Sequence, residues 1–279
     1  MTTFKSAAEL PAQTREAVHA LLLALADSKL FLGFHYGEWT FGTPALEASI
    51  AACSMAQDEF GHLRLLHACL NAQFQDHPQD LLERRAFTEF ANVPSLDQPL
   101  QHWADFVAVN FLTDGALTVI LTALQRSAFE PVANFVDKMV EEEKHHVRNA
   151  QGWFRALAAS NAQTKTALAE ACRRVLSATL EWLGPVEHTM MASLKNDAII
   201  NASWQELQQR FFDWIGPFAE QQNLNFGMHK DDGHWQASSL PDFSQWNANN
   251  RRCAATQPNE QLLYHLRGSK NAIFKLGEA

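Results

Sequence analysis

The sequence has 279 residues, 47% of them hydrophobic, and a net charge of −9 at neutral pH. This length is enough to bury a substantial core, and an acidic chain without clusters of Lys and Arg excludes nucleic acid from the expected partners. None of the four cysteines has the spacing of a zinc or iron–sulfur site. Since residues 1–6 do not resemble a signal peptide, we expect a cytoplasmic protein with reduced thiols.

Helical periodicity dominates the chain from its start, and alternating strand patterns are nearly absent. The pattern predicts one helix over residues 10–40 and a second over 45–73. They are separated by Gly42-Thr43-Pro44, which combines a helix stop with a helix restart. A connection with a short helical piece is predicted over residues 75–98.

The third predicted helix, residues 100–128, contains the most apolar stretch of the chain at 106–124. Its length suits a membrane span, but Asp114 lies within it, where a carboxylate is costly in lipid. We therefore predict a buried bundle helix and no membrane partner. Pro131 suits the first turn of a fourth helix that ends near residue 158.

Two further helices are predicted over residues 163–195, kinked or split at Gly184-Pro185, and over 202–222. Gly, His, Asp, Asn and Ser are frequent after that, so residues 223–279 are predicted to form an irregular tail with one short helix near 260–267. The expected fold is all-α: a single domain with a four-helix bundle, additional C-terminal helices within a core of residues 10–222, and this tail.

Two short segments of the chain are nearly alike. One reads Asp58-Glu59-Phe60-Gly61-His62, and the other, 84 residues later, reads Glu142-Glu143-Lys144-His145-His146. Residues three apart share a helix face, so each segment presents a carboxylate and an imidazole side by side. Two such Glu-x-x-His pairs are half of a carboxylate-bridged dinuclear metal site. Oxygen and nitrogen ligands of this kind favour iron, with manganese as the alternative.

The rise of a helix predicts where the next ligand should lie. Glu143 lies twelve residues after Pro131, about 18 Å along its helix, so its antiparallel neighbour should fall near residue 115. Asp114 is there, alone among apolar residues and in a polar stripe with Asn110 and Thr118. We therefore predict Asp114 as a ligand, the alternative being a buried acid that is only hydrogen-bonded.

The first hairpin is less informative. Glu59 lies fifteen residues after Pro44, so its partner should fall between about residues 25 and 29. Asp27 is the only acid in that window, and Lys29 occupies its far end. Asp27 is therefore the candidate for the sixth ligand, although a structural role suits it better.

The acids that precede the two motif glutamates have a predicted role of their own. A metal-bound His commonly donates its second N–H to a carboxylate, and Asp58 and Glu142 can each reach the His of the opposite hairpin. Two competing interpretations remain. One is an off-register pair of Glu142 with His145, and the other is a relic site that no longer binds metal.

These segments resemble the ferritin-like subunits of the bacterial phenylacetyl-CoA epoxidase of phenylacetate catabolism. Gln57-Asp58-Glu59-Phe60-Gly61-His62, Asp114-Gly115-Ala116 and Glu142-Glu143-x-x-His146 look like the metal-binding helices of its catalytic subunit. Leu25-Ala-Asp-Ser-Lys-Leu30 and Gly37-Glu38-Trp39 look instead like the companion structural subunit. The resemblance covers residues 20–160 well and implies a ferritin-like bundle with two iron ions.

The resemblance also implies which residues hold the metal. The implied ligands are Glu59, His62, Asp114, Glu143 and His146. An alignment through Trp39 puts Lys29 where the catalytic subunit has a ligand Glu. The ammonium of Lys29 can neutralise three of the carboxylates in place of a metal. Otherwise Asp27, a helix bulge or water completes the site.

The predicted function follows from the resemblance. It is a non-haem di-iron oxygenase that activates O₂ to oxygenate a small organic substrate, such as an aromatic acyl-CoA. A separate reductase would supply electrons, because the chain has no flavin, nicotinamide or iron–sulfur motif. The alternative is a non-catalytic structural subunit that pairs with a catalytic homologue. The chain is expected to form a homo-oligomer or a heteromer with a homologous subunit.

Overall fold

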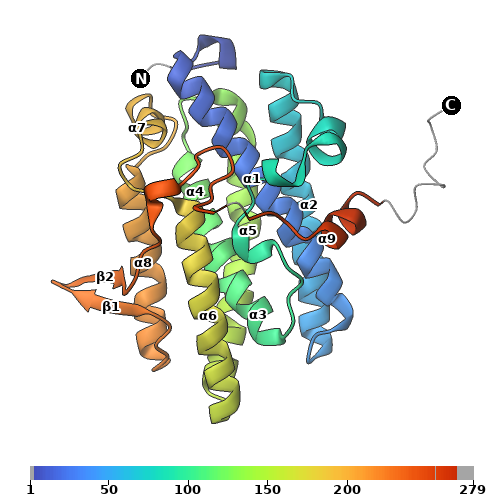
Figure 1. Ribbon diagram of the computed structural model, residues 1–279, viewed down its shortest axis with the longest axis vertical. Helices are drawn as coiled ribbons and strands as arrows, with labels where there is room; N and C mark the ends of the chain where they lie inside the picture. Colours follow the sequence, from blue (N-terminus) through green and yellow to red (C-terminus); the bar gives the residue numbers. More distant parts are fainter. Residues whose placement is uncertain (1–2, 255, 269–279) are drawn as a thin grey trace.

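Two long antiparallel helices begin the fold in the computed structural model, which describes residues 3–254 and 256–268. Helix α1 spans Ala12–Glu38 and helix α2 spans Leu46–Phe74, and the two pack along their length (Figure 1). The turn between them contains the predicted Gly42-Thr43-Pro44 break. Helix α2 ends where Gln75 takes a left-handed conformation with φ 66°, a common way to end a helix.

The second hairpin contains a helix with an irregular middle. Helix α3 (Trp103–Ala108) runs through a π-helical segment (Val109–Asp114) into helix α4 (Gly115–Leu124), and α5 (Glu130–Ala158) returns beside them. Helix α2 also packs against α5, which joins the two hairpins into the predicted four-helix bundle. A π-helical turn holds one residue more than an α-helical turn and is frequent at functional sites.

Three more helices cover this bundle. Helix α6 (Ala162–Leu183) packs against α3 and α5, α7 (Thr189–Asn196) against α1, and α8 (Trp204–Gln221) against α4 (Figure 1). Gly184-Pro185 separates α6 from α7, as predicted. The all-α, ferritin-like fold class is therefore confirmed.

The apolar helices are core helices. Ala12–Phe41 and Trp103–Leu124 are both long and apolar enough to cross a membrane, yet 78% and 83% of their most apolar windows are buried inside the protein. The prediction that residues 106–124 form a buried bundle helix agrees with this. Other helices of the same bundle provide the apolar surroundings that lipid would otherwise supply.

The C-terminal tail contains a hairpin that we did not predict. Strands β1 (Met228–Asp231) and β2 (His234–Ala237) pair antiparallel and project beside α8 (Figure 1). Their two-residue turn is Asp232-Gly233, with φ of 44° and 85°. An Asp-Gly pair is a strong hairpin signal, so the sequence contained the information. The short helix predicted near residue 260 is α9 (Glu260–Leu266).

The tail also closes the end of α6. Carbonyls in the last turn of an α-helix lack partners within the helix. Here the Trp246 indole donates to the carbonyl of residue 181 at 2.8 Å, and the Arg251 guanidinium donates to those of residues 182 and 183 at 2.7 and 3.1 Å. Gly184 has a φ of 75°, and a Cβ there would lie 2.4 Å from the Trp246 ring. Glycine at this position lets the tail reach the helix end.

Candidate metal centre

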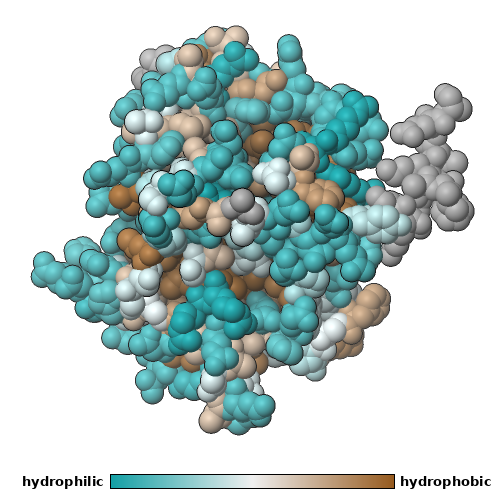
Figure 2. Space-filling view, viewed as in Figure 1, coloured by the Kyte–Doolittle hydropathy of each residue, from teal (hydrophilic) through white to brown (hydrophobic). Residues whose placement is uncertain are grey.

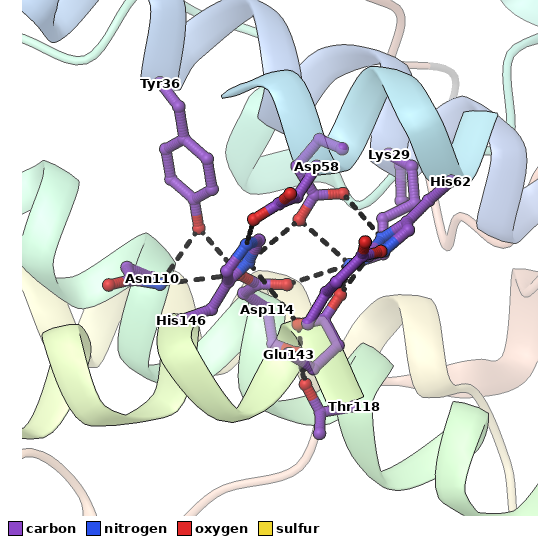
Figure 3. A network of polar contacts seen from close by, with 12 residues as sticks. Lys29, Tyr36, Asp58, His62, Asn110, Asp114, Thr118, Glu143 and His146 are labelled. Atoms are coloured by element: carbon purple, nitrogen blue, oxygen red, sulfur yellow. Dashed lines mark hydrogen bonds and ion pairs between the residues drawn. The ribbon is translucent and has the colours of Figure 1, made fainter. Parts of the chain in front are cut away.

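Side chains from all four bundle helices meet in one buried cluster (Figure 3). Helix α1 contributes a lysine, α2 and α5 each contribute a Glu-x-x-His pair, and the π-helical segment contributes an aspartate. Each of these six residues is at most 1% exposed. They are Lys29, Glu59, His62, Asp114, Glu143 and His146. The five ligands implied by the sequence therefore come together, and Lys29 lies among them.

The ammonium of Lys29 is bonded to three carboxylates. Its Nζ donates to Oε1 of Glu59 at 3.0 Å, to Oδ1 of Asp114 at 3.0 Å, and to Oε1 of Glu143. Burial lowers the pKa of Lys29, but the three carboxylates outweigh this effect and hold the pKa well above its ordinary value. The lysine therefore remains charged at neutral pH.

Two of the buried acids have shifted pKa values of opposite sign. Burial alone would raise the pKa of Asp114, but Lys29 and His146 hold it well below its ordinary value. Burial raises the pKa of Glu59 to about 7, against the opposing effect of Lys29, because Asp114 and Glu143 add negative charge nearby. Glu59 is therefore the carboxylate of this pair that takes up a proton more readily.

Each imidazole bridges the cluster to an acid near the surface. The Nδ1 of His146 lies 2.9 Å from Oδ2 of Asp114, and its Nε2 lies 3.4 Å from Oδ2 of Asp58. On the other side, Nε2 of His62 lies 2.9 Å from Oε2 of Glu142. Asp58 and Glu142 thus sit where the sequence predicted them, each at the His of the opposite hairpin. Their side chains are 27% and 28% exposed.

His146 has an environment that favours its charged form. Burial lowers its pKa, but Glu143 and Asp114 outweigh burial and hold it well above the ordinary value. The same pairing affects Asp58, because the hydrogen bond from His146 lowers the pKa of the Asp58 carboxyl.

Three polar neighbours complete the surroundings of the cluster. The Tyr36 hydroxyl donates to Oδ2 of Asp114 at 2.9 Å, and the Asn110 amide donates to the Tyr36 oxygen at 3.1 Å. Thr118 donates to Oε2 of Glu143 at 3.0 Å. The polar stripe of Asn110 and Thr118 was visible in the sequence. Tyr36 was missed, although it lies two helical turns after Lys29 on the same face of α1.

Asp27 lies outside the cluster, so the structure corrects its assignment as a candidate ligand. Arg85 binds both of its carboxylate oxygens, and the backbone N–H of Ala91 donates to Oδ2 at 2.9 Å. The physical reason is helical geometry, because residues two apart point about 200° apart around a helix. Lys29 faces the bundle centre, so Asp27 faces away from it. His145, the imidazole of the off-register alternative, is exposed.

The donor set is compatible with a metal ion, but Lys29 competes for it. Four residues offer ligand atoms within 4.8 Å of one another: Glu59, Asp114, Glu143 and His146. Among the described residues, Oε2 of Glu59 and Nδ1 of His62 are buried without a hydrogen-bond partner. However, Lys29 binds one oxygen of each carboxylate, and α1 supplies a cation where a two-ion site needs a fourth carboxylate. With Lys29 in place, the residues do not fit a two-ion centre.

Known proteins are similar to this chain over most of its length. Residues 1–245 match the family described as "phenylacetic acid catabolic protein". The chain is 28% identical to one subunit of the 1,2-phenylacetyl-CoA epoxidase of Escherichia coli (strain K12) over 222 residues, which are 76% of this chain and 70% of that protein. It is 25% identical to another subunit of the same enzyme over 194 residues, 67% of this chain and 77% of that protein.

Proposed function

Because the chain belongs to the family of phenylacetic acid catabolic proteins, we propose that it is a non-catalytic member of that family that assembles with a catalytic homologue. The sequence favoured a di-iron oxygenase and left this role as the alternative. Because Lys29 lies among the implied ligands, we now favour the non-catalytic role over the oxygenase.

One observation carries the proposal: the Lys29 ammonium is bonded to the three carboxylates that would have to bind metal. A metal-dependent oxygenase needs its ligand oxygens for the ions and open positions for the reactants. Here one oxygen of each carboxylate is already used by a cation that cannot change its oxidation state. The cluster thus holds the bundle together, and oxygen activation is assigned to the partner.

The expected partner is a homologous chain. The two relatives are named as subunits of one epoxidase, and this chain is similar to both. The surface also favours association, because Phe41, Leu46 and Ile50 are 98%, 73% and 62% exposed at the start of α2 and the turn before it. Figure 2 shows apolar surface at the lower right, where Figure 1 places this turn. Exposed apolar patches commonly mark protein interfaces.

The test compares the chain alone with the chain plus a catalytic homologue, and the first partner is the E. coli epoxidase subunit that is 28% identical to it. Each sample receives ferrous iron, a chemical reductant, O₂ and phenylacetyl-CoA, and the oxygenated product is measured. We expect no product from this chain alone, and co-elution with the partner on size-exclusion chromatography. Product formed by this chain alone, and lost in a Glu59→Gln variant, would contradict the proposal.

The di-iron oxygenase remains the second candidate, with iron, an aromatic acyl-CoA substrate and a separate reductase. The observation in its favour is that Oε2 of Glu59 and Nδ1 of His62 lie 3.8 Å apart, and that neither is used in a hydrogen bond among the described residues. Carboxylate oxygens and imidazole nitrogens are both common metal ligands. This candidate requires Lys29 to leave the cluster, and it predicts product in the first arm of the experiment above.

A further inference from the structure

We propose that Lys29 is a built-in cation that takes the structural place of a metal ion, and that Lys29 alone keeps the surrounding side chains from binding metal. The inference deepens the proposed function and rests on it for the idea of a non-catalytic chain. The inference adds that all the other metal-ligand residues keep the arrangement of a metal site. A non-catalytic role alone does not require this.

Every N–H donor of the Lys29 ammonium makes a hydrogen bond. A lysine ammonium has three N–H donors, and Lys29 directs one donor to each of three carboxylates. These carboxylates lie on α2, on the π-helical segment and on α5, while Lys29 itself lies on α1. A single nitrogen therefore joins all four bundle helices, which is the structural work of a bridging metal ion. Removing it would leave three buried carboxylates without the cation that they share.

The two imidazoles are oriented as metal ligands are. Both present Nδ1 to the inner carboxylates and Nε2 to an acid near the surface. This is the arrangement in which an outer carboxylate fixes the tautomer of a metal-binding His. The Nδ1 of His62 lies 3.4 Å from Oε1 of Glu143. Two ligands on one ion with bonds of ~2.1 Å lie about 3–3.5 Å apart, so this spacing still suits a shared ion.

Two unused polar atoms lie beside Lys29. Oε2 of Glu59 and Nδ1 of His62 are fully buried, have no hydrogen-bond partner among the described residues, and face each other at 3.8 Å. Buried polar atoms without partners are costly and call for an explanation. A ligand set that once served a metal, or still can serve one, explains why both atoms point inward.

One substitution is therefore expected to create a metal site. Lys29→Glu removes the blocking cation and adds the missing carboxylate on the fourth helix, which completes a set of four carboxylates and two imidazoles. Lys29→Met is the matched variant, because it removes the charge without adding a ligand. Lys144→Met is the control for loss of a lysine on α5, because the Lys144 side chain is 53% exposed and pairs only with Glu141 at the surface among the described residues.

The experiment measures metal content and thermal stability of these proteins after expression in iron- and manganese-supplemented medium. We expect the unchanged protein to hold no stoichiometric transition metal and to keep its Tm when a chelator is added. Lys29→Glu should bind about two ions per chain and lose Tm with the chelator. Metal-free Lys29→Met should melt on the order of 10 °C lower, and Lys144→Met should behave as the unchanged protein.

Three outcomes would overturn the inference. The first is that the unchanged protein holds stoichiometric metal and loses it in Glu59→Gln. The second is that Lys29→Glu folds but binds no metal. The third is that metal-free Lys29→Met is as stable as the unchanged protein. If Lys29→Glu fails to fold, the other two arms still decide the result. Because none of these readouts is product formation, the inference can fail while the non-catalytic role stands.

Discussion

Single residues in this protein show two ways of keeping a charge inside the fold. Lys29 and Arg252 are each met by carboxylates. Arg251 is 1% exposed and has a different environment, because its guanidinium lies 4.6, 5.2 and 5.6 Å from the rings of three tryptophans. Burial lowers the pKa of Arg251 to about 9. Aromatic faces and helix-end carbonyls therefore stabilise this cation in place of an anion.

His35 gives a prediction about pH. It is buried on α1 and donates from Nε2 to the carbonyl of Leu96 at 2.9 Å, and burial lowers its pKa from 6.5 to about 4. The unfolded chain therefore binds a proton more readily than the folded chain between these values. Stability from neutral His35 is fully present above pH 6.5 and is lost as the pH falls toward 4, by roughly 3 kcal/mol in total.

The measurement is the free energy of unfolding by urea at several pH values between 7 and 4. His35→Gln should show a shallower loss over this range than the unchanged protein, because it removes the group that takes up the proton. His234→Gln, at an exposed position of β2, is the control and should leave the slope unchanged. Equal slopes for the unchanged protein and His35→Gln would show that other groups cause the acid sensitivity.

At the scale of elements, the π-helical segment between α3 and α4 positions Asp114 in the buried cluster. The π-helical segment ends at Asp114, and Gly115 directly follows it. The ring of Trp214 on α8 occupies the space beside Gly115, where a Cβ would lie 2.1 Å from a ring atom. A larger residue at position 115 would therefore push α8 away from the helix that carries Asp114.

Gly115→Ala is predicted to destabilise the protein by roughly 2 kcal/mol or more, because the methyl group overlaps the Trp214 ring and the bundle must shift. Gly152→Ala is the matched variant in α5, since a Cβ at that position meets no atom within 4 Å. Replacing an unhindered helical glycine by alanine should stabilise the protein by about 0.5–1 kcal/mol. Thermal unfolding measures both, and effects of the same sign would contradict the packing explanation.

Much of the fold and of the site was predictable from the sequence for a physical reason. Helix breaks at Gly42 and Gly184 are local, and helix rise is constant, so the meeting of Asp114 with Glu143 followed from counting residues. The sequence did not predict the π-helical segment or the rotation of α1 about its own axis, because both depend on tertiary packing. That rotation decides whether Asp27 or Lys29 faces the centre of the bundle. The β1–β2 hairpin was predictable, and we missed its Asp-Gly signal.

At the scale of the whole molecule, the tail binds two neighbouring parts of the fold that are far apart in the sequence. Arg251 holds the end of α6, while the next residue, Arg252, reaches the connection between the two hairpins. The Arg252 guanidinium donates to both oxygens of Asp97, at 2.5 and 2.9 Å, and Arg252 and Asp97 are 1% and 6% exposed. The part of the tail around residues 251–252 therefore belongs to the folded unit and contributes to the stability of the connection before α3.

Arg252→Met is predicted to lower the free energy of unfolding by roughly 3–5 kcal/mol, because Asp97 would remain buried without a counter-charge. Arg84→Met is the matched control. Arg84 and Asp80 form an exposed pair whose side chains are 71% and 50% exposed, and such pairs contribute at most about 1 kcal/mol. Urea unfolding measures both variants, and limited proteolysis after residue 222 reports whether the tail detaches. Similar losses for both variants would refute the role given to the tail.

The extra residue in the π-helical segment has a consequence for length variation in this region. Deleting one residue between 109 and 114 would restore an ordinary α-helix and leave the faces of α3 and α4 nearly in phase, because the wider turn already absorbs the extra residue. A deletion within the regular helix α2 or α5 would instead rotate the residues on one side by about 100° relative to the other. A change of length by one residue is therefore expected to be tolerated better in the π-helical segment than in the helices that carry the two Glu-x-x-His pairs.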